Sequence, residues 1–72
     1  MKKSQHIGEI IQELRRKNDM TQEELALKSG VSYTTLIKIE RGSVQNPTVM
    51  TIKKIADALG VTVDIILGNV NS

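Results

Sequence analysis

The sequence predicts an all-α fold, a compact five-helix bundle in one domain that spans residues 1–72. Three observations favour it. Apolar residues recur at i, i+3 and i+4 spacing along most of the chain, the period of a helix that buries one face. Most of these segments begin at a Ser or Thr that can cap a helix, and most end near a glycine that can stop one. The expected helices span about residues 5–17, 21–28, 32–41, 48–59 and 62–67.

The first expected helix carries Ile7, Ile10, Ile11 and Leu14 on one face. Polar and charged side chains fill the remaining positions, as in a helix that lies at the surface of a small protein. The helix ends in a basic run that complements the negative end of the helix dipole. The basic residues of this run are Arg15, Arg16 and Lys17.

The second and third expected helices are joined by a tight turn. Thr21 and Glu24 stand three residues apart, the spacing of a capping box at a helix N-terminus. Gly30 can turn the chain at positive φ without steric cost, and Ser32 can cap the third helix. Gly42 marks the end of that helix.

The same two helices bury one face and leave another free. The residues expected to meet in a small core are Leu25, Ala26, Val31, Leu36 and Ile39. The opposite face of the third helix carries Tyr33, Thr34 and Lys38, none of which the core requires. A helix that packs through its back and presents such side chains in front has the right shape for a DNA major groove.

The fourth expected helix follows Pro47, which keeps Asn46 out of helical geometry, and Thr48 can cap it. Gly60 ends this helix. Its apolar positions are Val49, Ile52, Ile55, Ala56 and Leu59.

The fifth expected helix is short, begins at a Thr62 cap and is apolar on more than one face. One face should close the core, which leaves Val63, Ile66 and Val70 as an exposed apolar patch of a kind that small monomers rarely keep. We expect this patch to form a dimer interface. The alternative is that these residues only complete the core.

The stretch from Thr21 to Gly42 strongly resembles the helix-turn-helix of the Cro/CI-type repressors, the XRE family of transcriptional regulators. The resemblance extends from about Ile7 to Gly68 and includes the Asn46-Pro47-Thr48 segment. It implies a fold of the lambda-repressor-like DNA-binding type and a sequence-specific regulator of transcription, expected to be a repressor that binds a palindromic operator as a homodimer. The matching residues are Thr21, Gln22, Leu25, Ala26, Gly30, Ser32, Leu36, Ile39, Glu40 and Gly42.

The resemblance also implies roles for individual residues. Arg15 should pair with Glu40 and tie the first helix to the third. Gln22 should contact the DNA backbone, at a helix N-terminus that also offers free N–H groups to phosphate. The loop after the third helix should help to hold phosphate, and the C-terminal end should form the two-fold contact. The loop candidates are Arg41, Ser43 and Asn46.

The face of the third helix should read the bases. Lys38 can reach guanine O6 and N7, Thr34 can meet a thymine methyl or a phosphate, and Tyr33 is expected to contact a base or a phosphate. Ser32 and Thr35 complete the expected interface, although a partly buried Thr35 whose hydroxyl bonds back to the helix is an equal alternative. Ile37 departs from the polar family pattern; it could cover the following loop, touch a thymine methyl or meet a partner.

Composition excludes most other functions. The chain has 72 residues, no Cys and a single histidine, His6, which we expect to be exposed in the first turn and not a metal ligand. No phosphate-cradling glycine loop, nucleophile pair or metal-ligand spacing is present, so we expect no enzyme, no cofactor and no small-molecule effector. No apolar run approaches a membrane span and no signal peptide precedes the domain, so we expect a cytoplasmic protein. The net charge of +2 is modest for a DNA-binding protein, so the placement of its ten basic residues matters.

An alternative function is a protein-interaction module on the same scaffold, such as the antitoxin half of a toxin-antitoxin pair. Such a module would bind its partner through exposed apolar surface, including Ile37 and the C-terminal helix, and DNA binding would be a secondary function. A prophage regulator and a restriction-modification controller are equally compatible with the sequence.

Overall fold

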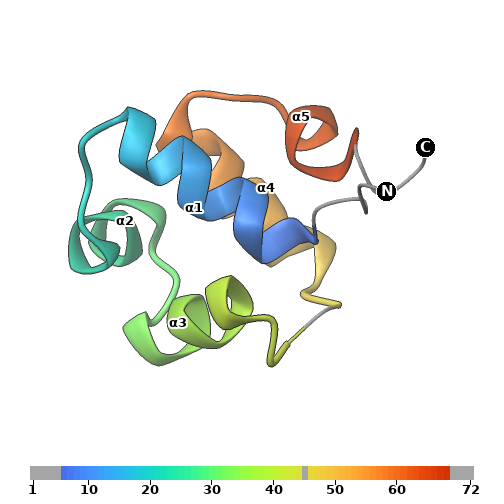
Figure 1. The fold of residues 1–72 in the computed structure, drawn as a ribbon, viewed down its shortest axis with the longest axis horizontal. Helices are drawn as coiled ribbons and strands as arrows, with labels where there is room; N and C mark the ends of the chain where they lie inside the picture. The colour runs from blue at the N-terminus through green and yellow to red at the C-terminus, as the bar shows by residue number, and fades with distance from the viewer. Residues whose placement is uncertain (1–5, 45, 69–72) are drawn as a thin grey trace, which may run out of the picture.

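The computed structural model describes residues 6–44 and 46–68, and within these ranges the chain forms five helices and no strand (Figure 1). The all-α prediction is therefore confirmed. None of the helices in the described ranges has the length and apolar character needed to span a membrane. The helices are α1 (Ile7–Lys17), α2 (Gln22–Ser29), α3 (Tyr33–Arg41), α4 (Val49–Leu59) and α5 (Val63–Leu67).

The helices surround one aliphatic core. In the view of Figure 1, α1 crosses in front of α4, with α3 on one side of α1 and α5 on the other. Contacts join α1 to α3 and α5, α2 to α3 and α4, and α4 to α5, so α1 and α4 tie the helix-turn-helix to the C-terminal helix. The fully buried aliphatic side chains come from all five helices: Ile11, Leu25, Leu36, Ile39, Ile55 and Ile66.

Local sequence signals account for the helix boundaries. Thr21, Ser32, Thr48 and Thr62 each cap the helix that follows them by accepting a backbone N–H through the side-chain oxygen. The helices that these four cap begin one residue later than the predicted ranges, because those ranges included the cap residues themselves.

The first helix begins at Ile7, two residues later than predicted, and Gln5 lies outside the described residues. His6 is exposed as expected but is the N-cap of α1, with its Nδ1 accepting the Glu9 N–H at 3.3 Å. The Glu9 side chain in turn accepts the His6 backbone N–H, which completes a capping box.

Two predictions of side-chain exposure are wrong. Ile66 was expected in an exposed patch, but it is fully buried in the core, and the exposed apolar side chain of α5 is Ile65, at 52%. Val49 was expected on the buried face of α4, but it occupies the first helical position and is 76% exposed. Val63 is half-buried against the core, and Val70 lies outside the described residues.

Candidate nucleic-acid interface

The third helix has a buried back and an exposed polar front. Leu36 and Ile39 face the core, at 0% and 1% exposure. The front carries Tyr33, Thr34 and Lys38, all of which are exposed, as the helical spacing predicts. The structure therefore exposes on the front of this helix the three side chains that were expected to contact bases or phosphates.

The start of this helix is held by its cap. The Thr35 N–H donates to Ser32 Oγ at 3.2 Å, and Ser32 Oγ donates to Thr35 Oγ1 at 2.8 Å. Thr35 is exposed, so the alternative in which it is partly buried is wrong. Its hydroxyl is nevertheless engaged by the cap residue, which leaves Ser32 and Thr35 at the surface with their hydroxyl groups bonded to one another.

An open, mainly apolar groove of about 470 Å³ lies between the front of α2 and the start of α3. Tyr33 is one of the residues that line it and is 44% exposed. Leu27 also lines it and is 86% exposed, an unusual position for a large apolar side chain. The groove was not predicted, because Leu27 lies outside the apolar pattern of α2.

The loop after α3 is positioned by the helix C-terminus. Gly42 adopts a left-handed conformation with φ 85°, and Ser43 N donates to Lys38 O at 2.9 Å. Val44 N donates to the same carbonyl at 3.2 Å, so these two loop amides close the helix end. The side chains of Arg41, Ser43 and Asn46 are exposed and remain candidates for phosphate contacts.

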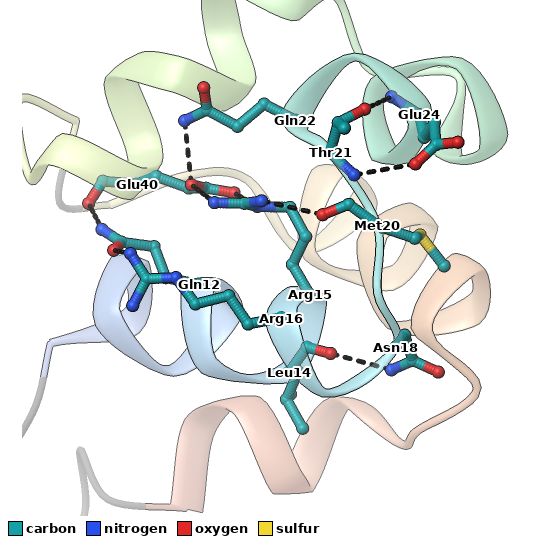
Figure 2. A network of polar contacts seen from close by, with 10 residues as sticks. All are labelled: Gln12, Leu14, Arg15, Arg16, Asn18, Met20, Thr21, Gln22, Glu24 and Glu40. Atoms are coloured by element: carbon teal, nitrogen blue, oxygen red, sulfur yellow. Dashed lines mark hydrogen bonds and ion pairs between the residues drawn. The ribbon is translucent and has the colours of Figure 1, made fainter.

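Arg15 and Glu40 form a buried ion pair between α1 and α3 (Figure 2). Arg15 Nε lies 2.9 Å from Glu40 Oε2 and Arg15 Nη2 lies 3.2 Å from Oε1, the paired geometry that suits a guanidinium and a carboxylate. The Arg15 side chain is 12% exposed and that of Glu40 is 1% exposed. The remaining Arg15 nitrogen, Nη1, donates to Met20 O at 2.8 Å and so holds the connection between α1 and α2.

Two glutamines complete this network. Gln22, at the first position of α2, donates from Nε2 to Glu40 Oε1 at 3.0 Å and is half-buried. Gln12, one of the polar residues of α1, donates from Nε2 to the backbone oxygen of Glu40 at 2.8 Å. Neither glutamine bond was predicted, since both join residues that lie far apart in the chain.

The fold and this face define a helix-turn-helix protein, with α2 and α3 as the two helices of the motif. Residues 11–66 match the model of the family described as helix-turn-helix, and the chain belongs to that family.

The chain is similar to a regulator of Sinorhizobium fredii and to a repressor of a Bacillus phage. It is 45% identical over 56 residues to an uncharacterized HTH-type transcriptional regulator, y4dJ, of Sinorhizobium fredii, a match that covers 78% of this chain and 71% of the regulator. It is 37% identical over 62 residues to the immunity repressor protein of Bacillus phage phi105, covering 86% of this chain but 42% of the repressor. The chain thus spans less than half the length of the phage protein.

The chain is also similar to solved structures. A crystal structure of SinR, a master regulator for biofilm formation, in complex with DNA superimposes with a TM-score of 0.83 at 34% sequence identity. The likeness covers 85% of this chain and 97% of the SinR chain. A complex of SinR with the SinI protein gives the same TM-score and identity.

Proposed function

We propose that the protein is a sequence-specific double-stranded DNA-binding regulator of transcription, and that it acts as a repressor. The observation that carries the proposal is the face of α3, where Tyr33, Thr34 and Lys38 are exposed on a helix whose opposite side is locked into the core. The helix-turn-helix family, the relatives named as a transcriptional regulator and an immunity repressor, and the DNA complex of SinR all support it.

In this proposal α3 enters the major groove and each side chain has a chemical role. Lys38 donates to guanine O6 and N7, Thr34 contacts a thymine methyl or a phosphate, and Tyr33 contacts a base or the backbone. Gln22 and the loop side chains hold phosphates on either side, which fixes the register of α3. The phosphate contacts from the loop are assigned to Arg41, Ser43 and Asn46.

We propose further that two copies bind a roughly palindromic operator. Two α3 helices would enter successive major grooves about 34 Å apart. Because Ile66 is buried, the apolar contact between copies would use Ile65, which is 52% exposed. In the cytoplasm, binding would repress transcription by covering a promoter. This mechanism requires no catalytic step, cofactor or small-molecule effector.

A second candidate is the protein-interaction module, and one observation favours it. Leu27 stands 86% exposed at the edge of the groove between α2 and α3, where it could pack against another protein. A partner bound there would also cover Tyr33, which lines the groove, but Thr34 and Lys38 do not line it, so the two functions predict different contacts at these two residues.

A nuclear magnetic resonance titration separates these functions. Isotope-labelled protein is titrated with a short duplex that it selects from random DNA and, in parallel, with a scrambled duplex of the same composition. The proposal predicts that the selected duplex shifts the amide signals of Tyr33, Thr34 and Lys38 and those at the start of α2. Shifts that are the same for both duplexes, or that spare α3, would contradict it.

A further inference from the structure

Glu40 is placed between the buried core and the surface that the proposed function assigns to DNA. Its carboxylate is 1% exposed, yet its Oε1 atom accepts a hydrogen bond from Gln22 Nε2, on the surface side, at 3.0 Å. The same oxygen accepts from Arg15 Nη2 at 3.2 Å (Figure 2). One buried carboxylate oxygen therefore joins α1, α2 and α3.

The bond to Glu40 restricts the orientation of the Gln22 side chain. A glutamine amide has two N–H donors on one nitrogen, and here one of them is directed at Glu40 Oε1. The direction of the second N–H is then fixed by the planar amide group. Gln22 is only partly buried, and among the described residues its amide makes no hydrogen bond other than the one to Glu40, so the second donor can meet a group outside the protein.

Arg15 makes this arrangement compatible with an anionic ligand. An unpaired carboxylate this close to the surface would repel a phosphate. Because Arg15 binds both oxygens of Glu40, the carboxylate is neutralised by a partner on α1. The donor on Gln22 is thereby held in place without adding net negative charge to the surface.

We propose that Glu40 is a positioning residue for DNA binding, which orients Gln22 so that its free N–H meets a backbone phosphate. The inference rests on the proposed function and deepens it. A freely rotating glutamine loses rotamer freedom when it binds, whereas a glutamine already held by Glu40 has been ordered during folding. Glu40 thus affects DNA affinity through Gln22 as well as stability through Arg15.

A double-mutant cycle tests this role by measuring operator affinity. Gln22→Met keeps the length of the side chain and removes its donors. In the natural background we expect it to weaken binding about fivefold, the size of one lost hydrogen bond. In a Glu40→Gln background the new amide has one acceptor oxygen in place of two, so it cannot accept from all the donors that surround Glu40. In that background we expect Gln22→Met to change affinity by less than about twofold.

Gln12→Met is the matched control, because Gln12 bonds to the backbone oxygen of Glu40 and not to its carboxylate. Its effect on affinity should be the same in both backgrounds. All measurements are made well below each variant's melting temperature. Should Glu40→Gln fail to fold, Arg15→Met combined with Glu40→Met provides the second background, because it removes both buried charges together.

The possible outcomes are distinct. Equal losses for Gln22→Met in both backgrounds would overturn the positioning role and show that Glu40 is structural only. No loss in either background would show that Gln22 contacts no phosphate, which also overturns it. In both cases the natural protein would still prefer its operator to scrambled DNA, whereas failure of the proposed function would remove that preference itself.

Discussion

Gly8 of α1 packs directly against the backbone carbonyl oxygen of Ile39 in α3. A β-carbon at position 8 would overlap that oxygen and would lie 2.8 Å from the carbonyl oxygen of Glu40. Both are backbone atoms that cannot rotate away. The close approach sets how α3 sits on α1, and so it places the helix that we assign to the major groove.

Gly8→Ala should therefore destabilise the protein. Helix propensity alone would favour alanine by about 1 kcal/mol, but the clash should outweigh it and lower the free energy of unfolding by roughly 1–3 kcal/mol. Urea denaturation measures the change. Gly68→Ala is the control, since a β-carbon there meets nothing within 4 Å and its φ of −56° suits alanine. A Gly8→Ala variant as stable as the natural protein would contradict the close packing.

Glu40→Ala should lower the melting temperature sharply. It leaves the Arg15 guanidinium, 12% exposed, without its carboxylate, and loss of one member of a buried pair costs about 3–5 kcal/mol. For a domain of this size each kcal/mol corresponds to roughly 4–8 °C. The double replacement Arg15→Met with Glu40→Met should recover much of the loss, because no buried charge remains. Thermal unfolding monitored by circular dichroism measures the midpoint. An unchanged midpoint for Glu40→Ala would contradict the prediction.

Alanine at Tyr33, Thr34 and Lys38 should abolish specific DNA binding and leave folding intact. Thr34 and Lys38 are exposed, so each of their changes should alter the free energy of unfolding by less than about 0.5 kcal/mol. Tyr33→Ala should cost more, because Tyr33 is only 44% exposed. If Lys38 binds a guanine, its loss alone should cost about 1–3 kcal/mol of binding and relax preference at that base pair. Fluorescence anisotropy with labelled operator measures the affinity.

Lys54→Ala is the charge-matched control for Lys38→Ala. Lys54 is exposed on α4, which makes no major contact with α3. The Lys54→Ala variant should therefore bind operator nearly as well as the natural protein. Affinity that survived all three changes on α3 would show that this helix does not read DNA.

Ile65 and Ile66 offer a direct comparison of two neighbouring isoleucines. Ile66→Ala should lower the free energy of unfolding by about 2–5 kcal/mol, because Ile66 is 0% exposed. Ile65→Ala should cost far less within one chain, but it should weaken self-association if α5 joins two copies. Denaturation and sedimentation velocity separate the two effects. Equal destabilisation by both changes would contradict the burial pattern of α5.

The helix boundaries and most of the core follow from local sequence. The Thr21–Glu24 capping box and the left-handed glycines at positions 30, 42 and 60 were predictable because caps and positive-φ turns depend on a few adjacent residues. The burial of Leu36 and Ile39, and with it the exposure of Tyr33 and Lys38, followed from helical period.

Features that depend on packing between distant segments were not predictable in the same way. Five residues of α5 are too few for helical period to distinguish Ile65 from Ile66, so the buried face was misassigned. The hydrogen bond from Gln22 to Glu40 joins helices whose relative placement no local pattern specifies. A weak signal did exist for Gly8, because an isolated glycine within a helix is costly and often marks close contact with a neighbour.

The most direct test of the central claim is selection of bound sequences from random double-stranded DNA, followed by titration of the selected duplex and a scrambled duplex at two salt concentrations. We predict a palindromic motif with half-sites about one helical turn apart and affinity at least ~10³ above that for scrambled DNA. We also predict that this preference persists as salt rises. Absence of an enriched motif, with weak binding that disappears at the higher salt concentration, would contradict it and leave only nonspecific attraction to phosphate.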